Sequence, residues 1–202
     1  MARQWLLVVS LVLTVLPATP LAAQRSISLL ALTGNAAGHA RAEADPDRPA
    51  ITPDHPVGWE VAAVQDQRAW RAALRLRHVQ ADLAIRGTSS AVLTRAAVRS
   101  WSLGVDAGRR LVGAPEVPTV HALLGVAVER ATFPVTGGDP RTVVVALAAL
   151  EGAVPLTARW RVVWRGEVGR SGALFGADEL PPGYAVRAGR RWNLGFGLGW
   201  RP

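Results

Sequence analysis

The sequence predicts an all-β protein, an eight-stranded antiparallel up-and-down barrel that spans a membrane. Three observations lead to this fold class. Apolar and polar residues alternate in several windows, as in WNLGFGLGW at residues 192–200, and a period of two indicates a strand with two different faces. Turn-forming segments divide the chain into about eight such windows. Beyond residue 23, no uncharged apolar run approaches the roughly 20 residues that a membrane helix needs.

The N-terminal segment has the pattern of an export signal. Residues 1–23 combine Arg3, the apolar run WLLVVSLVLTVL and the small-residue ending PATPLAA, which is typical of a secretory signal peptide cleaved after Ala23. An uncleaved membrane anchor is the alternative. Pro17 and Pro20 argue against it, because proline breaks a helix and these two stand where cleavage usually occurs. We therefore expect residues 24–202 to form one exported barrel domain.

The composition limits the chemistry that is open to the chain. There is no cysteine, which excludes disulfides, thiolate metal sites and a lipoprotein anchor. All 23 basic residues are arginine and the formal net charge is +8. These arginines are spread along the chain and form no basic cluster of about five to eight residues. Nucleic acid is therefore not expected as a partner.

The individual strands are located by alternation between breakers. In TARWRVVWRGEVG, for example, Trp160, Val162 and Trp164 share one face, whereas Arg161 and Arg165 share the other. The same pattern recurs along the chain. The eight strands are predicted near residues 26–38, 57–65, 69–86, 91–107, 118–130, 141–151, 156–169 and 184–200.

The connections between these strands alternate in length. Residues 39–56, 131–141 and 170–183 are long and rich in Pro, Gly and Asp, whereas residues 65–67 and 151–155 are short. Long loops at one rim and short turns at the other are typical of an up-and-down barrel in an outer membrane.

The tryptophans favour a membrane over a soluble environment. A strand in lipid needs an apolar outer face, while its lumen face can carry charge. Seven of the eight tryptophans lie beyond residue 23, and all seven fall on the apolar phase. Trp59 and Tyr184 are expected at the extracellular rim. Four others are expected to form a belt at the periplasmic interface: Trp70, Trp101, Trp160 and Trp200.

The leader, the amphipathic strands, the alternating connections and the closing WNLGFGLGW together resemble small bacterial outer-membrane β-barrels of the OmpA-transmembrane-domain and OmpX type. The resemblance covers nearly all of residues 26–202 and is one of pattern. It implies a location in the cell outer membrane, contact with lipid and lipopolysaccharide, insertion by the barrel-assembly machinery, and a monomer. Such barrels commonly end on an aromatic residue that this machinery reads, whereas here Arg201 and Pro202 follow Trp200.

Two strands depart from simple alternation. In the third, the apolar phase shifts from even to odd positions across His78, and in the fourth Arg95 and Arg99 share the phase of Trp101. An arginine that faces the bilayer midplane costs roughly 2–4 kcal/mol. Either a bulge near Arg99 resets the phase, or residues 86–95 form a polar hairpin beyond the membrane. We favour the hairpin.

Charged residues on the inward phase are expected to fill the lumen. An eight-stranded barrel is just wide enough for its own side chains, and buried charges need partners. The hypothesis is a structural network of ion pairs, with a narrow anion-preferring pore as the sharper alternative. Its members are predicted to be Arg71, Arg75, Arg77, Asp82, Asp106, Glu129, Arg159, Arg161, Arg165 and Glu167.

The last strand illustrates the two faces. Its even positions are large and apolar, while Gly195, Gly197 and Gly199 are expected to keep the lumen side small. We expect Leu198→Arg to block membrane assembly and Gly197→Ala to be mild.

No motif points to catalysis, a metal or a cofactor. The four histidines lack metal-ligand spacing, and neither a G-x-S-x-G elbow nor His-x-Ser is present. A catalytic pairing of His121 with Glu129 or Ser100 is the remaining possibility. We expect no enzyme, but an integral outer-membrane barrel with a structural or surface-interaction role. The alternative is a soluble exported lipocalin-like barrel that binds an apolar small ligand, in which the tryptophans would point inward.

Overall fold

The computed structural model describes most of the chain beyond the leader. The described residues are 24–37, 40–42, 50–86, 91–114, 116–135, 137–176, 180 and 183–202. The predicted signal peptide lies outside them, as does most of the predicted loop 39–56. No helix in these described ranges is long and apolar enough to cross a membrane.

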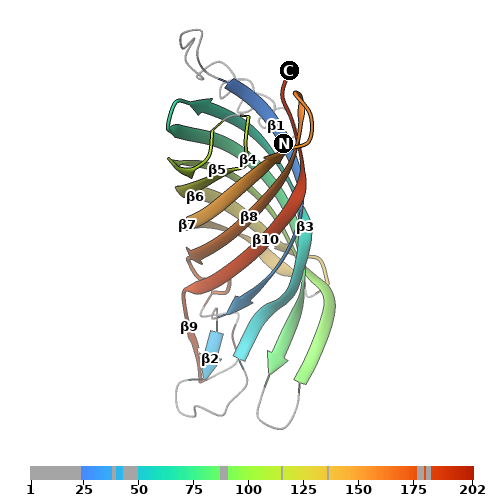
Figure 1. Ribbon diagram of the computed structural model, residues 1–202. Coiled ribbons are helices and arrows are strands. Elements are labelled where there is room, and N and C mark those ends of the chain that lie inside the picture. Colours follow the sequence, from blue (N-terminus) through green and yellow to red (C-terminus); the bar gives the residue numbers. More distant parts are fainter. Residues whose placement is uncertain are drawn as a thin grey trace, which may run out of the picture.

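Eight long antiparallel strands form a closed ring (Figure 1). Each strand pairs with its neighbours in the sequence, and β1 pairs with both β3 and β10, which closes the ring. The predicted fold class is therefore confirmed. The strands are β1 (Gln24–Ala37), β3 (Ala50–Gln67), β4 (Trp70–Arg86), β5 (Ala91–Val112), β6 (Thr119–Phe133), β7 (Gly138–Pro155), β8 (Trp160–Ser171) and β10 (Gly189–Trp200).

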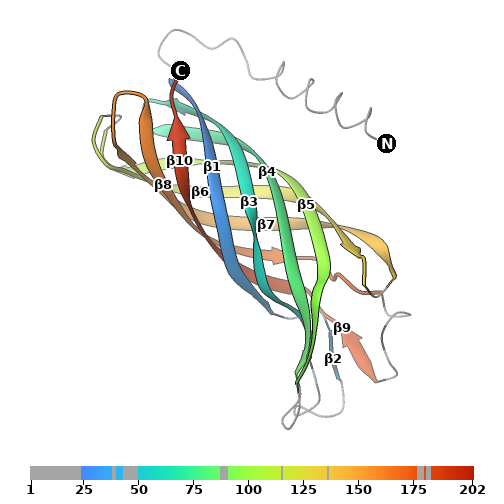
Figure 2. The ribbon, with the colours of Figure 1, turned by 90° about the vertical axis from the view of Figure 1, so that its right-hand side faces the viewer.

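The two ends of the barrel differ. β1 begins and β10 ends at the same end, which we call the terminal mouth (Figures 1 and 2). At the opposite end, the loop mouth, the short strands β2 (Ala40–Ala42) and β9 (Tyr184–Val186) pair with each other, and β2 also pairs with β3. The hairpin of β4 and β5 extends past the neighbouring strands there (Figure 2). The extra strands and the long hairpin thus enlarge the loop mouth only.

Side chains alternate between lipid-like and lumen environments around the ring. On β10, Asn193 faces inward and is buried, while Phe196 and Leu198 face outward and are 63% and 48% exposed. All seven tryptophans occupy the outward phase of their strands, and five of them are among the exposed large apolar residues. This is the opposite of the inward-pointing tryptophans that the lipocalin-like alternative requires.

Several predicted strand boundaries are wrong by four residues or more. β3 begins at Ala50 rather than near 57, and β7 continues through Pro155, so residues 151–155 are strand rather than turn. The turn follows at residues 156–159, where the backbone N–H of Leu156 donates to the Trp160 carbonyl at 2.8 Å. Glu151 and Gly152 looked like breakers in the sequence, but Glu151 faces the lumen and is buried.

The apparent phase shift in β4 is a change in the kind of side chain that faces the lumen. The same alternate positions face inward on both sides of His78. Arg75 and Arg77 face inward, and Val79, Ala81 and Leu83 continue on the same phase. The inward-facing positions therefore stay the same across His78. The inward residues of β4 are charged toward the terminal mouth and apolar toward the loop mouth.

The β4–β5 hairpin extends past the neighbouring strands and also contains a β-bulge. The register shifts between Ala81 and Leu83, because Ala81 pairs with Val98 while Leu83 pairs with Thr94. Ala96 has a φ of 49°, and its N–H donates to Asp82 Oδ1 at 2.8 Å. The bulge thus lies before Arg99, and Asp82 is a bulge residue rather than a member of the lumen network.

Apolar side chains fill the loop-mouth half of the lumen. Phe133 and Phe175 pack there with ring centroids 5.7 Å apart, and Leu174 is buried beside them. The buried members of this apolar cluster are Ala40, Ile51, Ala81, Leu83, Ala97, Val98, Ala127, Ala131, Phe133, Val143, Val145, Leu147 and Leu174.

The prediction for Gly197 needs correction. A Cβ on this residue would lie 1.8 Å from the Leu29 carbonyl oxygen and 2.8 Å from the Leu30 Cα. Both are backbone atoms of β1 and have little freedom to move away. Gly197→Ala is therefore expected to be disruptive, since the glycine permits close approach of β1 and β10.

Candidate functional site

The middle of the lumen is occupied by interlocked charges, which we call the lumen network. Arg165 of β8 is at its centre and is among the largest fully buried side chains. Its Nη2 lies 2.8 Å from Asp106 Oδ2 and 3.0 Å from Glu167 Oε2, and its Nη1 lies 3.2 Å from Glu151 Oε2. One guanidinium therefore ties β5, β7 and β8 together across the barrel.

Arg75 of β4 makes a second set of three contacts. It donates to Asp106 through Nε at 2.5 Å, to Glu60 through Nη1 at 2.8 Å and to Glu151 through Nη2 at 2.6 Å. Asp106 and Glu151 are thus shared with Arg165. Such sharing satisfies the hydrogen-bonding capacity of buried carboxylates, which each have two oxygens to pair.

Arg77 and Arg71 extend the network in both directions. Arg77 Nη2 lies 2.7 Å from Glu60 Oε2 and 2.8 Å from Glu167 Oε2. Toward the terminal mouth, Arg71 donates two hydrogen bonds to Asp66, from Nε to Oδ1 at 2.6 Å and from Nη2 to Oδ2 at 2.9 Å. Its Nη1 donates to Glu151 Oε1 at 2.6 Å, so Glu151 receives three arginines.

The charges in the lumen balance. Four arginines (71, 75, 77 and 165) face five carboxylates (60, 66, 106, 151 and 167). Arg161 lies 3.8 Å from Asp66, and Arg191 binds Glu129. Counting these gives six arginines and six carboxylates. A network of this composition fills the lumen without an excess of either sign.

The structure brings together six of the residues assigned to the network from the sequence: Arg71, Arg75, Arg77, Asp106, Arg165 and Glu167. Glu129 pairs with Arg191 nearer the loop mouth, and Arg161 lies at the terminal mouth. Arg159 is misplaced in the prediction: β8 begins at Trp160, so Arg159 is an exposed turn residue.

Three carboxylates of the network were missed. Glu60 lies on the inward phase of a strand that alternation does predict, so its position carried the signal. Asp66 and Glu151 lie in segments that were read as turns. In each case a strand continues farther than the breaker residues suggest, and the acidic side chain points into the lumen.

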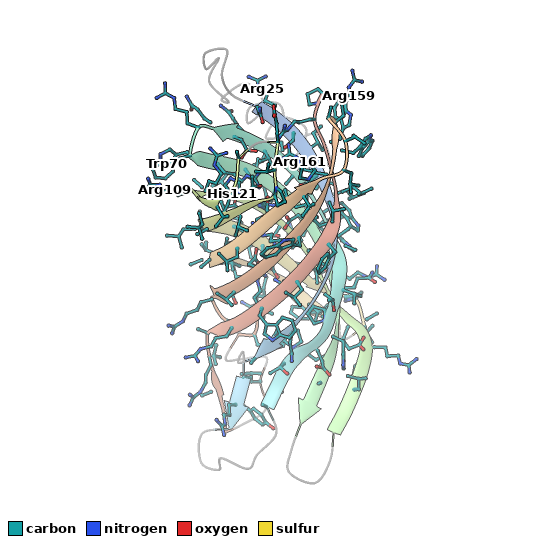
Figure 3. All side chains as sticks on the ribbon, in the orientation of Figure 1. Arg25, Trp70, Arg109, His121, Arg159 and Arg161 are labelled. Atoms are coloured by element: carbon teal, nitrogen blue, oxygen red, sulfur yellow. The ribbon has the colours of Figure 1, made fainter. Side chains whose placement is uncertain are left out.

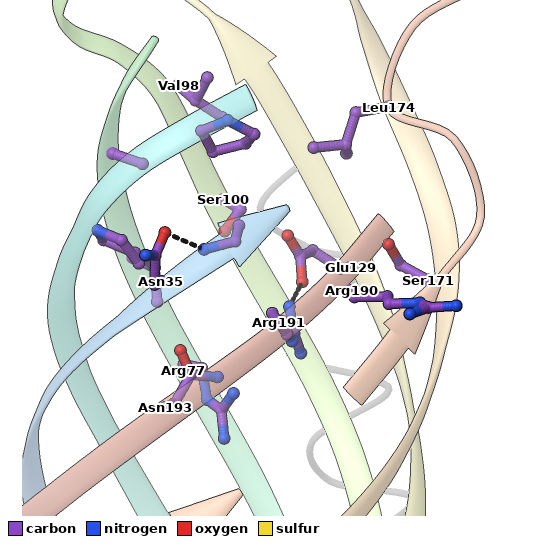
Figure 4. Close-up of a pocket in the computed structure, with 15 residues that line it drawn as sticks. Asn35, Arg77, Val98, Ser100, Glu129, Ser171, Leu174, Arg190, Arg191 and Asn193 are labelled. Atoms are coloured by element: carbon purple, nitrogen blue, oxygen red, sulfur yellow. Dashed lines mark hydrogen bonds and ion pairs between the residues drawn. The ribbon is translucent and has the colours of Figure 1, made fainter. Parts of the chain in front are cut away.

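Above the network, a small cavity of about 60 Å³ separates the charged and apolar halves of the lumen (Figure 4). Ser100, Asn193 and the Glu129–Arg191 pair line its polar side, and Leu174 lies on its apolar side. Asn193 Nδ2 donates to Glu167 Oε1 at 3.2 Å. This cavity therefore lies between the charged and the apolar packing of the lumen.

The histidines are dispersed. His121 and Glu129 are eight residues apart on one strand, which separates them by about 26 Å. Ser100 stands opposite Ala131, ten residues from His121 on that strand, so neither catalytic pairing considered from the sequence forms. His55 is exposed beside Asp54. Within the described ranges, no group of three His, Cys, Asp or Glu could hold a metal ion.

An aromatic cluster on the outer surface corrects the predicted belt. Trp59 and Trp101 meet edge to face with ring centroids 5.4 Å apart, and His78 stacks on Trp59 at 5.9 Å. Trp59 and Trp101 were expected at opposite rims, yet they are neighbours, because β5 continues 11 residues beyond Trp101 to Val112. Trp70 does lie at the terminal mouth (Figure 3).

The terminal mouth holds a separate basic cavity of about 200 Å³. His121 and Arg161 lie at this end of the barrel, below the rim that carries Arg25 and Arg159 (Figure 3). Both side chains line the cavity and are buried, at 3% and 7% exposure.

A closed eight-stranded ring, apolar outside and charged inside, defines the class: the chain has the fold of small outer-membrane β-barrel proteins. Neisserial surface protein A (NspA) is similar, with a TM-score of 0.61 and 11% identity over 89% of this chain and 99% of that one. The outer membrane protein OprG from Pseudomonas aeruginosa has a TM-score of 0.60 and 10% identity over 90% and 96%. No protein-family model and no curated protein sequence matches the chain.

Proposed function

We propose that the chain is an integral outer-membrane barrel with a closed lumen and a structural or surface-interaction role, without enzymatic activity. The observation that carries this proposal is the pairing of an apolar outer face with a charge-balanced interior. Large apolar side chains stay exposed around the ring, among them Leu124 at 71% and Phe196 at 63%. Soluble proteins rarely expose so large a contiguous apolar surface, whereas a lipid bilayer requires it.

The two mouths then acquire an orientation. The terminal mouth, with its short turns, faces the periplasm, and the loop mouth faces outward, as in barrels with short periplasmic turns and longer extracellular loops. The surface interactions of this proposal are made by the loop mouth, where β2, β9 and the β4–β5 hairpin extend the ring.

Lipopolysaccharide is the lipid partner that this orientation favours. Arg170 and Arg190 stand directly opposite each other in the β8–β10 register and are exposed. Like charges in this position repel, so an anion between them would relieve the repulsion. They line an open groove of about 660 Å³ with Val168 and Trp192, which offers apolar surface beside the charges.

The groove can be tested with a double variant. We expect Arg170→Gln with Arg190→Gln to abolish the thermal stabilisation that lipopolysaccharide gives the detergent-solubilised barrel. The matched control, Arg109→Gln with Arg159→Gln, removes two arginines at the opposite mouth and should retain it. Equal behaviour of the two double variants would reject this groove as the lipid contact.

An anion-preferring pore receives less support than a closed barrel. The six lumen arginines are matched by six carboxylates, and Arg165 and Glu151 are fully buried within the network. A conducting pathway would have to separate these pairs, which is costly in a low-dielectric interior. We expect no steady single-channel conductance in planar bilayers, and a stable unitary conductance would overturn the closed lumen.

The first experiment is fractionation of the expressed protein, followed by gel mobility of unheated and boiled samples in detergent. A heat-modifiable band in the outer-membrane fraction is expected, because a closed barrel resists unfolding by detergent until it is heated. A soluble periplasmic protein without a mobility shift would reject the proposal and favour the lipocalin-like alternative.

A further inference from the structure

We propose that the terminal mouth contains a binding site for a phosphate-type oxyanion. The site is the basic cavity described above, which we call the mouth cavity. It is separated from the proposed lipopolysaccharide groove by the length of the barrel, and it goes beyond the structural role proposed for the protein.

The walls of the mouth cavity carry far more positive than negative charge. Its lining includes five arginines and one carboxylate: Arg68, Arg71, Arg110, Arg161, Arg201 and Asp66. Asp66 is already gripped by Arg71 through two hydrogen bonds. Arg68, Arg110 and Arg201 lie outside the charge-balanced set of the lumen, so the lining has a formal excess of positive charge that a bound anion would compensate.

Two buried side chains that line the cavity each have one hydrogen-bonding atom without a partner. Arg161 Nη2 and His121 Nδ1 are inaccessible to solvent and have no hydrogen-bond partner among the described residues. Their contacts to Asp66 are long, at 3.8 Å from Arg161 Nη1 and 3.9 Å from His121 Nε2. A buried donor without a partner is costly, so a ligand that accepts from Arg161 would remove that cost.

The cavity wall is held in place before any ligand binds. Arg68 adopts a φ of 51° in the tight β3–β4 turn, and its carbonyl accepts a hydrogen bond from Arg110 Nη2. Arg71 is fixed by Asp66 and Glu151. A preorganised set of donors loses little entropy on binding.

The chemistry of the wall favours a phosphate over a carboxylate. Guanidinium groups present planar forks of N–H donors that match the oxygens of phosphate in pairs. Several arginines converge from β4, β5, β8 and the C-terminal segment after β10, so donors come from several sides. A tetrahedral dianion can accept from all these directions, whereas a carboxylate has two oxygens in one plane.

The test is a titration of the detergent-folded barrel with inorganic phosphate, in which binding is measured by isothermal titration calorimetry. Saturable binding is expected, with Arg161→Gln and Arg110→Gln each weakening it by about tenfold or more, the usual effect of losing one charge-assisted hydrogen bond. Arg159→Gln is the matched control: it removes the same charge two residues away on the exposed turn, and less than a twofold change is expected. Heat-modifiable gel mobility verifies that each variant is a folded barrel. Two site variants are used, so that the test can still be made if one of them fails to fold.

A second arm separates a soluble anion from a lipid headgroup, using nanodiscs with and without phosphatidic acid. Competition by phosphatidic acid that is lost in Arg161→Gln would identify the headgroup as the source. Binding of inorganic phosphate that is unaffected by phosphatidic acid would identify a soluble phosphate. Absence of saturable binding in both arms, or equal weakening by Arg159→Gln, would overturn the site while leaving the membrane barrel intact.

Discussion

Arg165 shows how many buried ionic contacts a single side chain can make in this lumen. It contacts three carboxylates from three strands, and none of these groups reaches solvent. Removing one partner from a buried ionic network leaves uncompensated charge, which is far more costly than the net stabilisation by the pair itself. The same chain carries Arg159 in an exposed turn, so the two environments can be compared directly.

We predict that Arg165→Ala lowers the free energy of unfolding by roughly 3–5 kcal/mol. Arg159→Ala should change it by no more than about 0.5 kcal/mol, as is usual for an exposed residue. The measurement is urea unfolding of the detergent-folded barrel, followed by tryptophan fluorescence. Similar midpoints for both variants would mean that the buried network adds nothing to stability.

The network residues also show where sequence reasoning succeeds. Alternation placed Arg75 and Arg77 on the inward phase correctly, because their strand has no breaker near them. It missed Asp66 and Glu151, because a charged residue next to Gly or Gln reads as a turn when the strand that continues through it cannot be seen. Which arginine meets which carboxylate depends on the register of distant strands, and no local pattern contains that information.

At the scale of elements, close packing of β1 on β10 sets the limit on side-chain size. Gly197 faces the backbone of Leu29 and Leu30, whereas Gly166 on β8 meets only Leu194 Cδ2, at 3.7 Å from an added Cβ. The two glycines lie in neighbouring strands of the same wall. They differ in whether the nearest atom is fixed backbone or the end of a flexible side chain.

We predict that Gly197→Ala destabilises the barrel by about 1–3 kcal/mol through overpacking, while Gly166→Ala is close to neutral. Thermal melting of the folded band, read as the temperature at which heat-modifiability is lost, will rank the two variants. A tolerated Gly197→Ala would show that β1 and β10 can separate slightly without loss of the closed ring.

Element boundaries were the least predictable part of the fold. The number and order of the long strands follow from alternation and turn residues, and they are confirmed. The ends are not, because β5 runs on to Val112 and β7 to Pro155 through residues that local propensity assigns to turns. The short strands β2 and β9 pair across a large sequence distance, which alternation within one segment cannot reveal.

At the scale of the whole molecule, the decisive property is that the outer surface of the barrel is apolar while its lumen is charged. Leu198 lies on the outward phase of β10, at 48% exposure, and Leu156 lies in the turn after β7 at 59% exposure. Both are exposed leucines, but only Leu198 belongs to the wall that a bilayer would cover. In water the two positions would tolerate a charge equally well.

We predict that Leu198→Arg blocks outer-membrane assembly, since an arginine on the lipid face is unfavourable, by roughly 2–4 kcal/mol at the midplane and by less toward the interface. Leu156→Arg should assemble as the parent does. The assay is the fraction of each variant that reaches the outer membrane as a heat-modifiable band. Normal assembly of Leu198→Arg would argue that lipid does not surround this wall.

The ring closes where β1 meets β10, so its seam joins residues such as Ile27 and Trp200 from the two ends of the chain. The pairings from β1–β3 to β7–β8 need only earlier parts of the polypeptide, whereas both pairings of β10, with β8 and with β1, need residues 189–200. Before those residues pair, two strand edges have no partner, a state that lipid cannot accommodate. Closure of the ring therefore depends on the pairing of β1 with β10. Because both ends meet at one mouth, a circular permutant with a short linker would move that event to another pair of strands.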